Sequence, residues 1–156
     1  MASLNITIGK PAPDFEAVDD RGERMRLKDF RGKNVVLYFY PKDNTPGCTI
    51  EARSFNAFLN EFEKRNTVVL GVSTDDVDSH ERFRNNCGLE FRLIADPDKE
   101  ISQAYGALSG FMSWLGMAQR VTVLIDKKGI VRHVWDQVSP RRHPEEVLET
   151  IDELGL

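Results

Sequence analysis

The sequence of 156 residues predicts a single α/β domain in which helices cover a sheet that contains parallel strands. Two apolar runs, 35–40 (VVLYFY) and 68–73 (VVLGVS), are typical of strands that are buried on both faces. Between them, the segment 48–64 carries apolar residues at helical spacing. Because a strand, a helix and a second strand in this order require a right-handed crossover, we expect the two strands to pair in parallel.

A β-hairpin is expected ahead of this unit, in segment 15–27, because the turn sequence DDRG separates two short alternating runs. The helix over 48–64 presents a stripe of four apolar residues to the sheet: Ala52, Phe55, Leu59 and Phe62. A shorter helix is expected over 78–87, ending at Gly88, a residue type that suits a helix C-terminus.

The next elements are a brief strand at 92–95 and a helix over 98–105. Two further strands, 121–125 and 130–135, flank the turn sequence DKKG. We expect these two strands to form an antiparallel hairpin.

The last helix has signals at both ends. Pro144 suits its first turn, Glu145 and Glu146 favour the positive end of its dipole, and Gly155 ends it. Its expected buried stripe consists of Val147, Leu148, Ile151 and Leu154. The resulting order, βαβ, then α, then ββα, is that of a thioredoxin-like fold with an N-terminal β-hairpin extension. No repeat or linker divides residues 1–156 into further domains.

The composition excludes several classes of protein. Hydrophobic residues make up 40% and charged residues 29% of the chain, which is typical of a globular domain. The formal net charge is −4, and basic residues are scattered among acidic ones, so a nucleic-acid partner is not expected. No apolar run approaches the roughly 18 residues needed to cross a membrane, and MASLNITIGKPAP lacks the pattern of a secretory signal. We therefore expect a cytoplasmic protein.

Two cysteines, Cys48 and Cys87, are too few for a disulfide framework, and neither lies in a CxxC or Cys/His zinc motif. In the cytoplasm both thiols are expected to be reduced. His80 and His143 stand at expected helix starts and His133 in a strand, without the spacing of metal ligands. The sequence thus predicts no metal and no cofactor.

Cys48 follows a buried strand directly and falls in the first turn of the next helix. In open α/β sheets, ligands bind in the crevice beyond the carboxyl ends of the strands. The unpaired N–H groups and the dipole of a helix start favour a thiolate. An inert buried cysteine is the alternative, but a turn rich in Pro, Gly and Thr is not typical of one.

The residues around Cys48 resemble a known active site. Pro41, Thr45 and Cys48 fit the pattern PxxxTxxC, and YPKDNTPGCTIEA is similar to the active site of the peroxiredoxins, in the branch of bacterioferritin comigratory protein or peroxiredoxin Q. The resemblance extends to GKPAPDF, VVLYFY and RVTVLIDKKGIVRHVW. It implies a thiol-dependent peroxidase that reduces hydrogen peroxide and organic hydroperoxides without metal, haem or flavin.

The resemblance also implies a role for each residue of the motif. Cys48 is the expected peroxidatic residue, which attacks a peroxide oxygen and becomes a sulfenic acid. The Thr45 hydroxyl is expected to bond the peroxide and the attacking sulfur, and Pro41 to shield the site from water. The backbone N–H groups of Gly47 and Cys48 are expected to hold the peroxide oxygens.

The resemblance also implies an arginine at the start of the later strand, and Arg120 in QRVTVLID matches that position. A guanidinium is always charged and offers several donors, so Arg120 can stabilise both the thiolate and the transition state. For Glu51 two interpretations stand side by side. It either orients an arginine or only favours the helix N-terminus.

This chain departs from the branch at the resolving cysteine. The common position, five residues after Cys48, is occupied by Arg53. A second position in the branch aligns near Arg84, and Cys87 lies three residues later on the same helix. Cys87 can resolve Cys48 only if the first turn of the Cys48 helix unwinds, since disulfides need α-carbons within about 7 Å. Otherwise thioredoxin or a glutathione-type thiol reduces the sulfenic acid directly.

The segment 106–119 (GALSGFMSWLGMAQ) is unusually apolar. It either folds onto the core or forms an apolar collar that favours bulky organic peroxides or docks a partner.

Two other functions are weighed against a peroxidase. A thioredoxin-like disulfide exchanger is disfavoured because there is no CxxC and no proline between Pro97 and Pro140. A redox sensor or binding module would oxidise Cys48 once without turnover. We expect a monomer or a weak homodimer.

Overall fold

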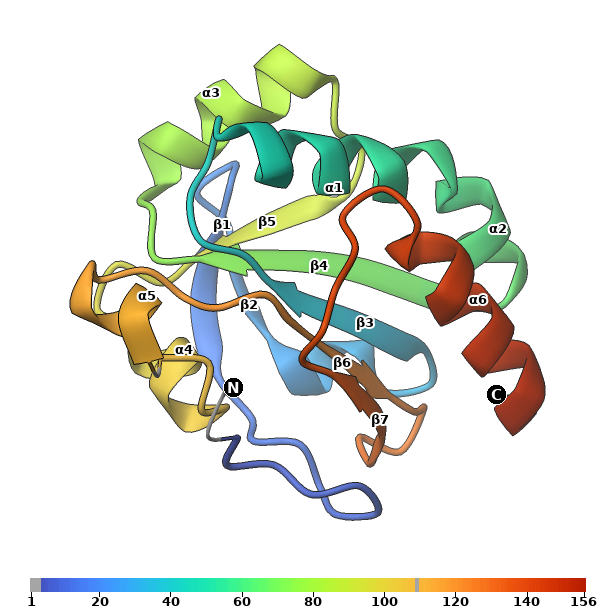
Figure 1. Ribbon diagram of the computed structural model, residues 1–156. Coiled ribbons are helices and arrows are strands. Elements are labelled where there is room, and N and C mark those ends of the chain that lie inside the picture. Colours follow the sequence, from blue (N-terminus) through green and yellow to red (C-terminus); the bar gives the residue numbers. More distant parts are fainter. Residues whose placement is uncertain (1–3, 109) are drawn as a thin grey trace.

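The computed structural model describes residues 4–108 and 110–156, with the backbone only at residues 110 and 111. In this part of the chain one sheet has the strand order β2-β1-β5-β4-β3-β6-β7 (Figure 1). The strands are β1 (Glu16–Asp19), β2 (Arg24–Arg26), β3 (Asn34–Phe39), β4 (Thr67–Ser73), β5 (Arg92–Ala95), β6 (Val121–Ile125) and β7 (Val131–Trp135). The pairs β3/β4 and β4/β5 are parallel and the others antiparallel, which confirms the predicted parallel unit and both hairpins.

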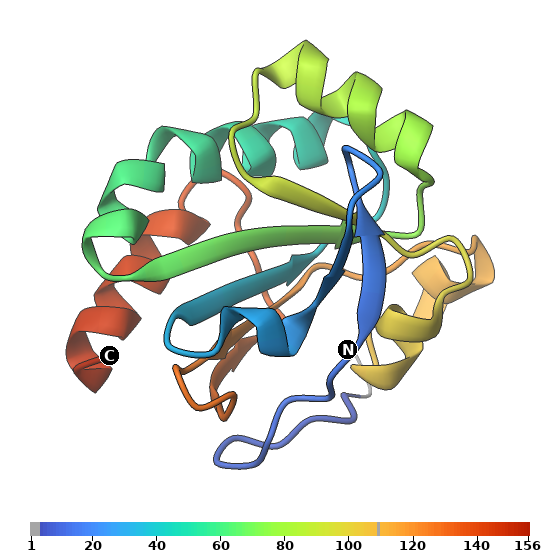
Figure 2. The same cartoon turned by 180° about the vertical axis from the view of Figure 1, so that it is seen from behind.

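Helices cover both faces of this sheet (Figures 1 and 2). They are η1 (Leu27–Phe30), α1 (Pro46–Ala57), α2 (Leu59–Lys64), α3 (Val77–Cys87), α4 (Glu100–Ala104), α5 (Gly110–Trp114) and α6 (His143–Leu154). The helices α1, α2, α3 and α6 pack on one face, while η1, α4 and the N-terminal segment lie on the other. The thioredoxin-like α/β architecture predicted from the sequence is confirmed.

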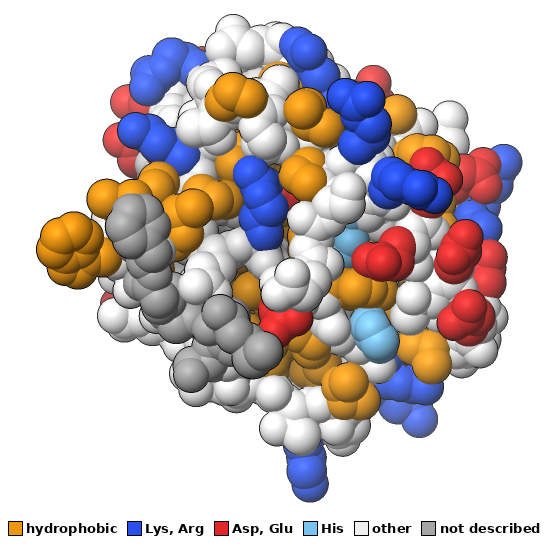
Figure 3. All heavy atoms as spheres, viewed as in Figure 1, with side chains coloured by type: hydrophobic (Ala, Val, Ile, Leu, Met, Phe, Trp, Pro, Cys, Tyr) orange, Lys and Arg blue, Asp and Glu red, His pale blue; other side chains and the backbone are white. Residues whose placement is uncertain are grey.

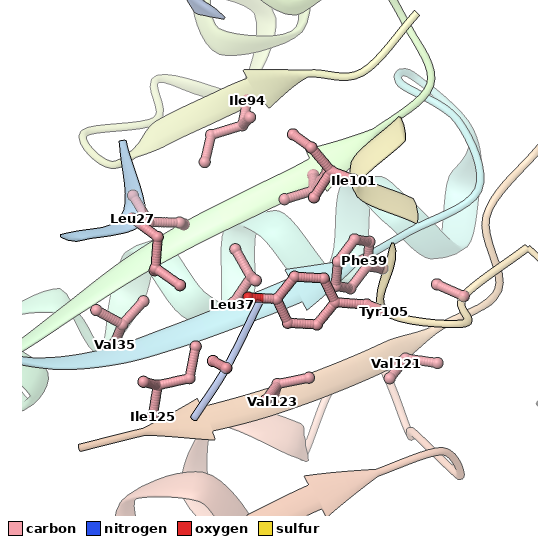
Figure 4. Close-up of a cluster of buried hydrophobic side chains, with 14 of the residues drawn as sticks. Leu27, Val35, Leu37, Phe39, Ile94, Ile101, Tyr105, Val121, Val123 and Ile125 are labelled. Carbon is pink, nitrogen blue, oxygen red and sulfur yellow. The ribbon is translucent and has the colours of Figure 1, made fainter. Parts of the chain in front are cut away.

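The strand β3 shows why both faces are covered. Its side chains alternate between two apolar clusters, and all six of its residues are buried. Val35, Leu37 and Phe39 point into the cluster beside η1 and α4, which Figure 4 shows together with Ile101 and Tyr105. The side chains in between point into the cluster beneath α1, α2, α3 and α6. Cys48 belongs to this second cluster.

The single helix expected over 48–64 is wrong in one respect, because the structure divides it into α1 and α2 at Phe58. Phe58 has φ −103° and ψ 10°, outside the helical region. The expected stripe still faces the core, since Ala52, Phe55 and Phe62 are fully buried and Leu59 packs beside them. The break lets neighbouring Phe58 and Leu59 both pack against the second cluster.

The helix ends follow the expected glycines. Gly88 and Gly155 both have left-handed backbones, with φ of 64° and 68°. The expected burial of Leu154 is wrong, because this side chain is 38% exposed. After Gly155 the chain turns back, the Leu156 N–H donates to the Ile151 carbonyl, and Leu156 packs on the second cluster instead.

The apolar segment 106–119 divides its residues between core and surface. Ala107 and Ala118 are fully buried, whereas Trp114 is 86% exposed and Leu115 is also exposed. In Figure 3, hydrophobic side chains gather at the side of the molecule where α5 lies, while acidic and basic side chains are interspersed over the rest of that face. Within the described residues no helix has the length and apolarity to cross a membrane.

Candidate active site

The site lies where β3 ends and α1 begins. Thr45 has an extended backbone and precedes α1, Pro46 occupies the first turn, and Cys48 follows within the same turn. The Cys48 side chain is only 1% exposed and packs in the cluster that also contains Tyr40 and Ala52. The central position of β3, with β4 and β6 on either side, therefore places the thiol at the carboxyl end of the sheet's parallel part.

Arg120, the residue directly before β6, places its guanidinium beside this thiol. Its Nη2 lies 3.4 Å from Cys48 Sγ, and its Nη1 donates to Glu51 Oε1 at 2.9 Å. Arg120 is 24% exposed, whereas Glu51 is fully buried. Gly47 leaves room for this arrangement, because a Cβ there would lie 2.6 Å from Arg120 Nη2. The structure thus brings together four residues singled out in the sequence.

Of the two interpretations of Glu51, the one in which it orients an arginine agrees with this geometry. Burial raises the pKa of Glu51 to about 7, although the charge and the hydrogen bond of Arg120 act against that shift. Glu51 Oε2 and the Tyr38 hydroxyl are both buried, and neither has a hydrogen-bond partner within the described chain. Burial, followed by the charge of Glu51, raises the pKa of Tyr38.

The loop before Cys48 contributes further groups. The Thr45 hydroxyl donates to the Lys42 carbonyl at 2.8 Å, which leaves its lone pairs free to accept a hydrogen bond. Pro41, in the same loop, is buried. Gly47 and Cys48 are in the first turn of α1, where backbone N–H groups have no intrahelical acceptor.

Cys87 is the last residue of α3 and packs, partly buried, against the cluster that contains Cys48. Its neighbour Asn86 donates to the Asn44 side chain at 3.1 Å, which ties the end of α3 to the loop before Cys48. Both thiols are free. Arg84 instead directs its guanidinium to Asp20 Oδ2 at 2.8 Å, in the turn between β1 and β2.

One cluster beside the site was not expected from the sequence. Asp43, Asp75 and His80 bring their ligand-type atoms within 4.8 Å of one another, although they come from three separate segments. Each group is already engaged by protein donors or acceptors: His80 binds Asp43, and Asp75 accepts from the Asp43 N–H. The cluster is therefore built as a hydrogen-bonded network rather than as an open set of metal ligands. The spacing of these residues along the chain held no signal for it.

Comparison with known proteins agrees with this geometry. A model of the AhpC/TSA family matches residues 8–134. A putative peroxiredoxin bcp of Helicobacter pylori is 42% identical over 150 residues, which covers 94% of this chain and 98% of that protein.

Solved structures give the same result. A peroxiredoxin Q of Xylella fastidiosa superposes with a TM-score of 0.91 at 32% identity, covering 97% of this chain and 99% of that one. The bacterioferritin comigratory protein of Xanthomonas campestris, studied for its alkyl peroxide reduction activity, superposes with a TM-score of 0.85 at 31% identity and covers 100% of both chains.

Proposed function

Since the chain belongs to the AhpC/TSA family and is a thiol-dependent peroxidase of the Bcp/peroxiredoxin Q type, we propose that Cys48 is its peroxidatic residue. The observation that carries this proposal is the contact of 3.4 Å between Arg120 Nη2 and Cys48 Sγ. A permanently charged guanidinium at this distance favours the thiolate, which is the nucleophilic form. The first turn of α1 acts in the same direction through its unpaired N–H groups.

In the proposed reaction, the Cys48 thiolate attacks the terminal oxygen of a hydroperoxide. An S–O bond forms while the O–O bond breaks, and the sulfur is oxidised to a sulfenic acid. The departing oxygen takes up a proton and leaves as an alcohol, or as water when the substrate is hydrogen peroxide. Arg120 and the N–H groups of Gly47 and Cys48 stabilise the negative charge that develops on this oxygen.

Thr45 and Pro41 complete the substrate site in this proposal. Because the Thr45 hydroxyl already donates to the Lys42 carbonyl, it is oriented to accept a hydrogen bond from the hydroperoxide O–H. The buried Pro41 limits the access of water to the site. Hydrogen peroxide and organic hydroperoxides are the proposed substrates. The alkyl peroxide reduction studied for the Xanthomonas campestris protein supports the second class.

We further propose that Cys87 resolves the sulfenic acid. It packs against the apolar cluster that contains Cys48, and the adjacent Asn86 contacts the loop that leads to Cys48. The first turn of α1 has to unwind for the two sulfurs to form a bond of about 2 Å. Attack of the Cys87 thiolate on the sulfenic sulfur releases water and leaves an intramolecular disulfide, which thioredoxin or a glutathione-type thiol then reduces.

One experiment tests both steps. The reduced protein receives one equivalent of hydrogen peroxide, and its intact mass is measured under denaturing, non-reducing conditions with dimedone present. A loss of two hydrogens without an adduct supports resolution by Cys87. A dimedone adduct with Cys87 still free shows instead that an external thiol reduces Cys48.

Two matched variants identify the reactive thiol. Cys48→Ser is expected to abolish peroxide consumption, whereas Cys87→Ser is expected to keep the oxidation step and to accumulate the dimedone adduct. Peroxide consumption by Cys48→Ser at the wild-type rate would refute the role of Cys48.

Continued turnover with a thiol donor separates a peroxidase from a redox sensor. We propose that the protein works in the cytoplasm, where thiols are held reduced, as a monomer or weak homodimer.

A further inference from the structure

A buried carboxylate lies in the loop that leads to Cys48. Asp43 is 5% exposed, and both of its oxygens accept hydrogen bonds. Oδ1 accepts from the Tyr40 hydroxyl at 2.6 Å. Oδ2 accepts from the Ser79 hydroxyl at 2.9 Å and faces His80 Nδ1 at 2.6 Å. Asp43 therefore joins the loop to α3, the helix that ends at Cys87.

The partners of His80 determine its protonation state. Its Nε2 lies 2.9 Å from the Ile94 carbonyl, which can only accept, so Nε2 carries a proton. Its Nδ1 faces the Asp43 carboxylate, which also accepts. With both ring nitrogens donating, His80 is an imidazolium, and its side chain is fully buried. Bonded to Asp43 on one side and to β5 on the other, it bridges the loop to the sheet.

The charged groups around His80 agree with this state. Burial lowers the pKa of His80, but the hydrogen bond and the charge of Asp43, the Ile94 carbonyl and the charge of Asp75 outweigh that effect and leave the pKa above its ordinary value. The titratable groups that face His80 among the described residues are Asp43 from the loop, Asp75 from the segment after β4, and Tyr40 from the end of β3.

Other contacts also hold this loop from outside. Asn44 has a left-handed backbone with φ of 60°, a conformation that asparagine adopts more readily than most non-glycine residues, and its side-chain oxygen accepts from Asn86 of α3 at 3.1 Å. Asp43 is held on its other side as well, because its N–H donates to Asp75 Oδ2 at 2.8 Å. The backbone immediately before α1 is therefore held by contacts from α3 and from the segment after β4.

We propose that His80 is a positioning residue of the peroxidase reaction: as an imidazolium it holds Asp43 against α3 and so keeps residues 41–45 and the first turn of α1 in the conformation that sets Cys48 against Arg120. Releasing this clamp lets the first turn open and exposes the thiol. The proposal rests on the peroxidatic role of Cys48 for its effect on the reaction, but the clamp itself can be measured without peroxide.

Two substitutions separate the two bonds of His80. In His80→Asn the amide nitrogen reaches roughly the position of Nδ1 and keeps a bond to Asp43. In His80→Gln it reaches roughly the position of Nε2 and keeps only the bond to Ile94. A hydrogen bond to a charged group contributes about 1.5–3 kcal/mol, which corresponds to an opening equilibrium changed about tenfold to a hundredfold. His133→Gln, at a half-buried position of β7 and outside the Asp43 network, serves as the control.

The first readout is alkylation of Cys48 by a bulky maleimide, in a Cys87→Ser background that leaves one thiol. Cys48 is almost inaccessible while the first turn of α1 is folded, so alkylation reports the opening of that turn. We expect His80→Gln to speed alkylation about tenfold to a hundredfold and to slow oxidation by peroxide, while His80→Asn changes both much less. Equal effects of the two substitutions, or none from His80→Gln, would overturn the proposal, because mere loss of packing affects both variants alike.

The second readout needs no variant. In ¹⁵N-labelled wild-type protein, the His80 ring nitrogens are expected to show a doubly protonated imidazolium at pH 7. A neutral ring at that pH would also overturn the proposal. If wild-type Cys48 does not react with peroxide, the proposed function fails. The alkylation rates and the protonation state of the His80 ring still test the clamp in that case.

Discussion

Replacing Gly47 with alanine is expected to slow the oxidation of Cys48 without weakening the fold. A Cβ at this position would lie 2.6 Å from Arg120 Nη2 and 3.5 Å from Arg120 Cζ. Nonbonded heavy atoms prefer a separation of about 3.5–4 Å, so the guanidinium has to shift by about 1 Å. The shift is possible because the clash involves the end of a flexible side chain. It moves Nη2 out of its contact with Cys48 Sγ.

The magnitude follows from what that contact does. Removing one preorganised donor from a developing oxyanion typically slows a reaction by about 10²- to 10³-fold. We therefore expect Gly47→Ala to oxidise about a hundredfold more slowly. The fold is not expected to suffer, because Gly47 is in α1 and does not have a positive φ. Alanine in a helix is more stable than glycine by about 0.5–1 kcal/mol.

The assay is the second-order rate of peroxide consumption by the reduced protein, measured by rapid quenching and intact mass, with thermal unfolding as the control for stability. A double-mutant cycle with Arg120→Ala isolates the mechanism. Once Arg120 is absent, the alanine at position 47 has nothing to displace and is expected to have no further effect. An unchanged rate in Gly47→Ala, or an equal slowing in the Arg120→Ala background, would refute the geometry described here.

Three further predictions follow. Thr45→Val removes the hydroxyl that accepts from the hydroperoxide and is expected to slow oxidation about 10²-fold, whereas Thr45→Ser retains most of the rate; equal rates for the two variants, by stopped-flow kinetics, would contradict the role of the hydroxyl. Burial raises the folded-state pKa of Glu51 from 4.5 to about 7, so the folded protein keeps a proton that the unfolded chain releases. The contribution of Glu51 to the free energy of unfolding therefore falls by about 3 kcal/mol as the pH rises from about 4.5 to 7. Denaturant titrations across this range should show that Glu51→Gln removes the fall, and the same slope in both proteins would disprove it. Gly71→Ala places a Cβ 3.0 Å from the Tyr38 hydroxyl and is expected to lower the free energy of unfolding by about 1–3 kcal/mol. The same denaturant titrations measure this loss, and a variant as stable as the wild type would contradict it.

Most elements of the fold were predictable because their signals are local. The alternation of two apolar sets along β3 requires cover on both faces, and the glycines at 88 and 155 end their helices through backbone geometry alone. Two predictions about short segments were wrong, and the cause in each case lies in tertiary packing rather than in the local sequence. The break at Phe58 and the packing of Leu156, rather than Leu154, on the core arise from how α1, α2 and α6 meet the second apolar cluster.

The candidate site was likewise predictable from the sequence only in part. The position of Cys48 between a buried strand and a helix singled it out as a candidate site residue, and the resemblance of the contiguous motif to the peroxiredoxins added Pro41, Thr45 and Arg120. The pairing of Arg120 with Glu51 and the room that Gly47 leaves for the guanidinium depend on how β6 lies beside β3. The sequence by itself left the role of Glu51 open between two interpretations.

The sequence alone thus singled out Cys48 as the candidate reactive thiol and predicted the elements that carry it, because hydrophobic periodicity, turn residues and a short motif act over a few neighbouring residues. Only the tertiary structure decided how the loop before Cys48 is held. Asp43 and His80 are 37 positions apart, and nothing in their spacing predicts a contact. They meet because β4 and α3 return the chain to the end of β3, where both side chains are buried and Asp43 Oδ2 lies 2.6 Å from His80 Nδ1.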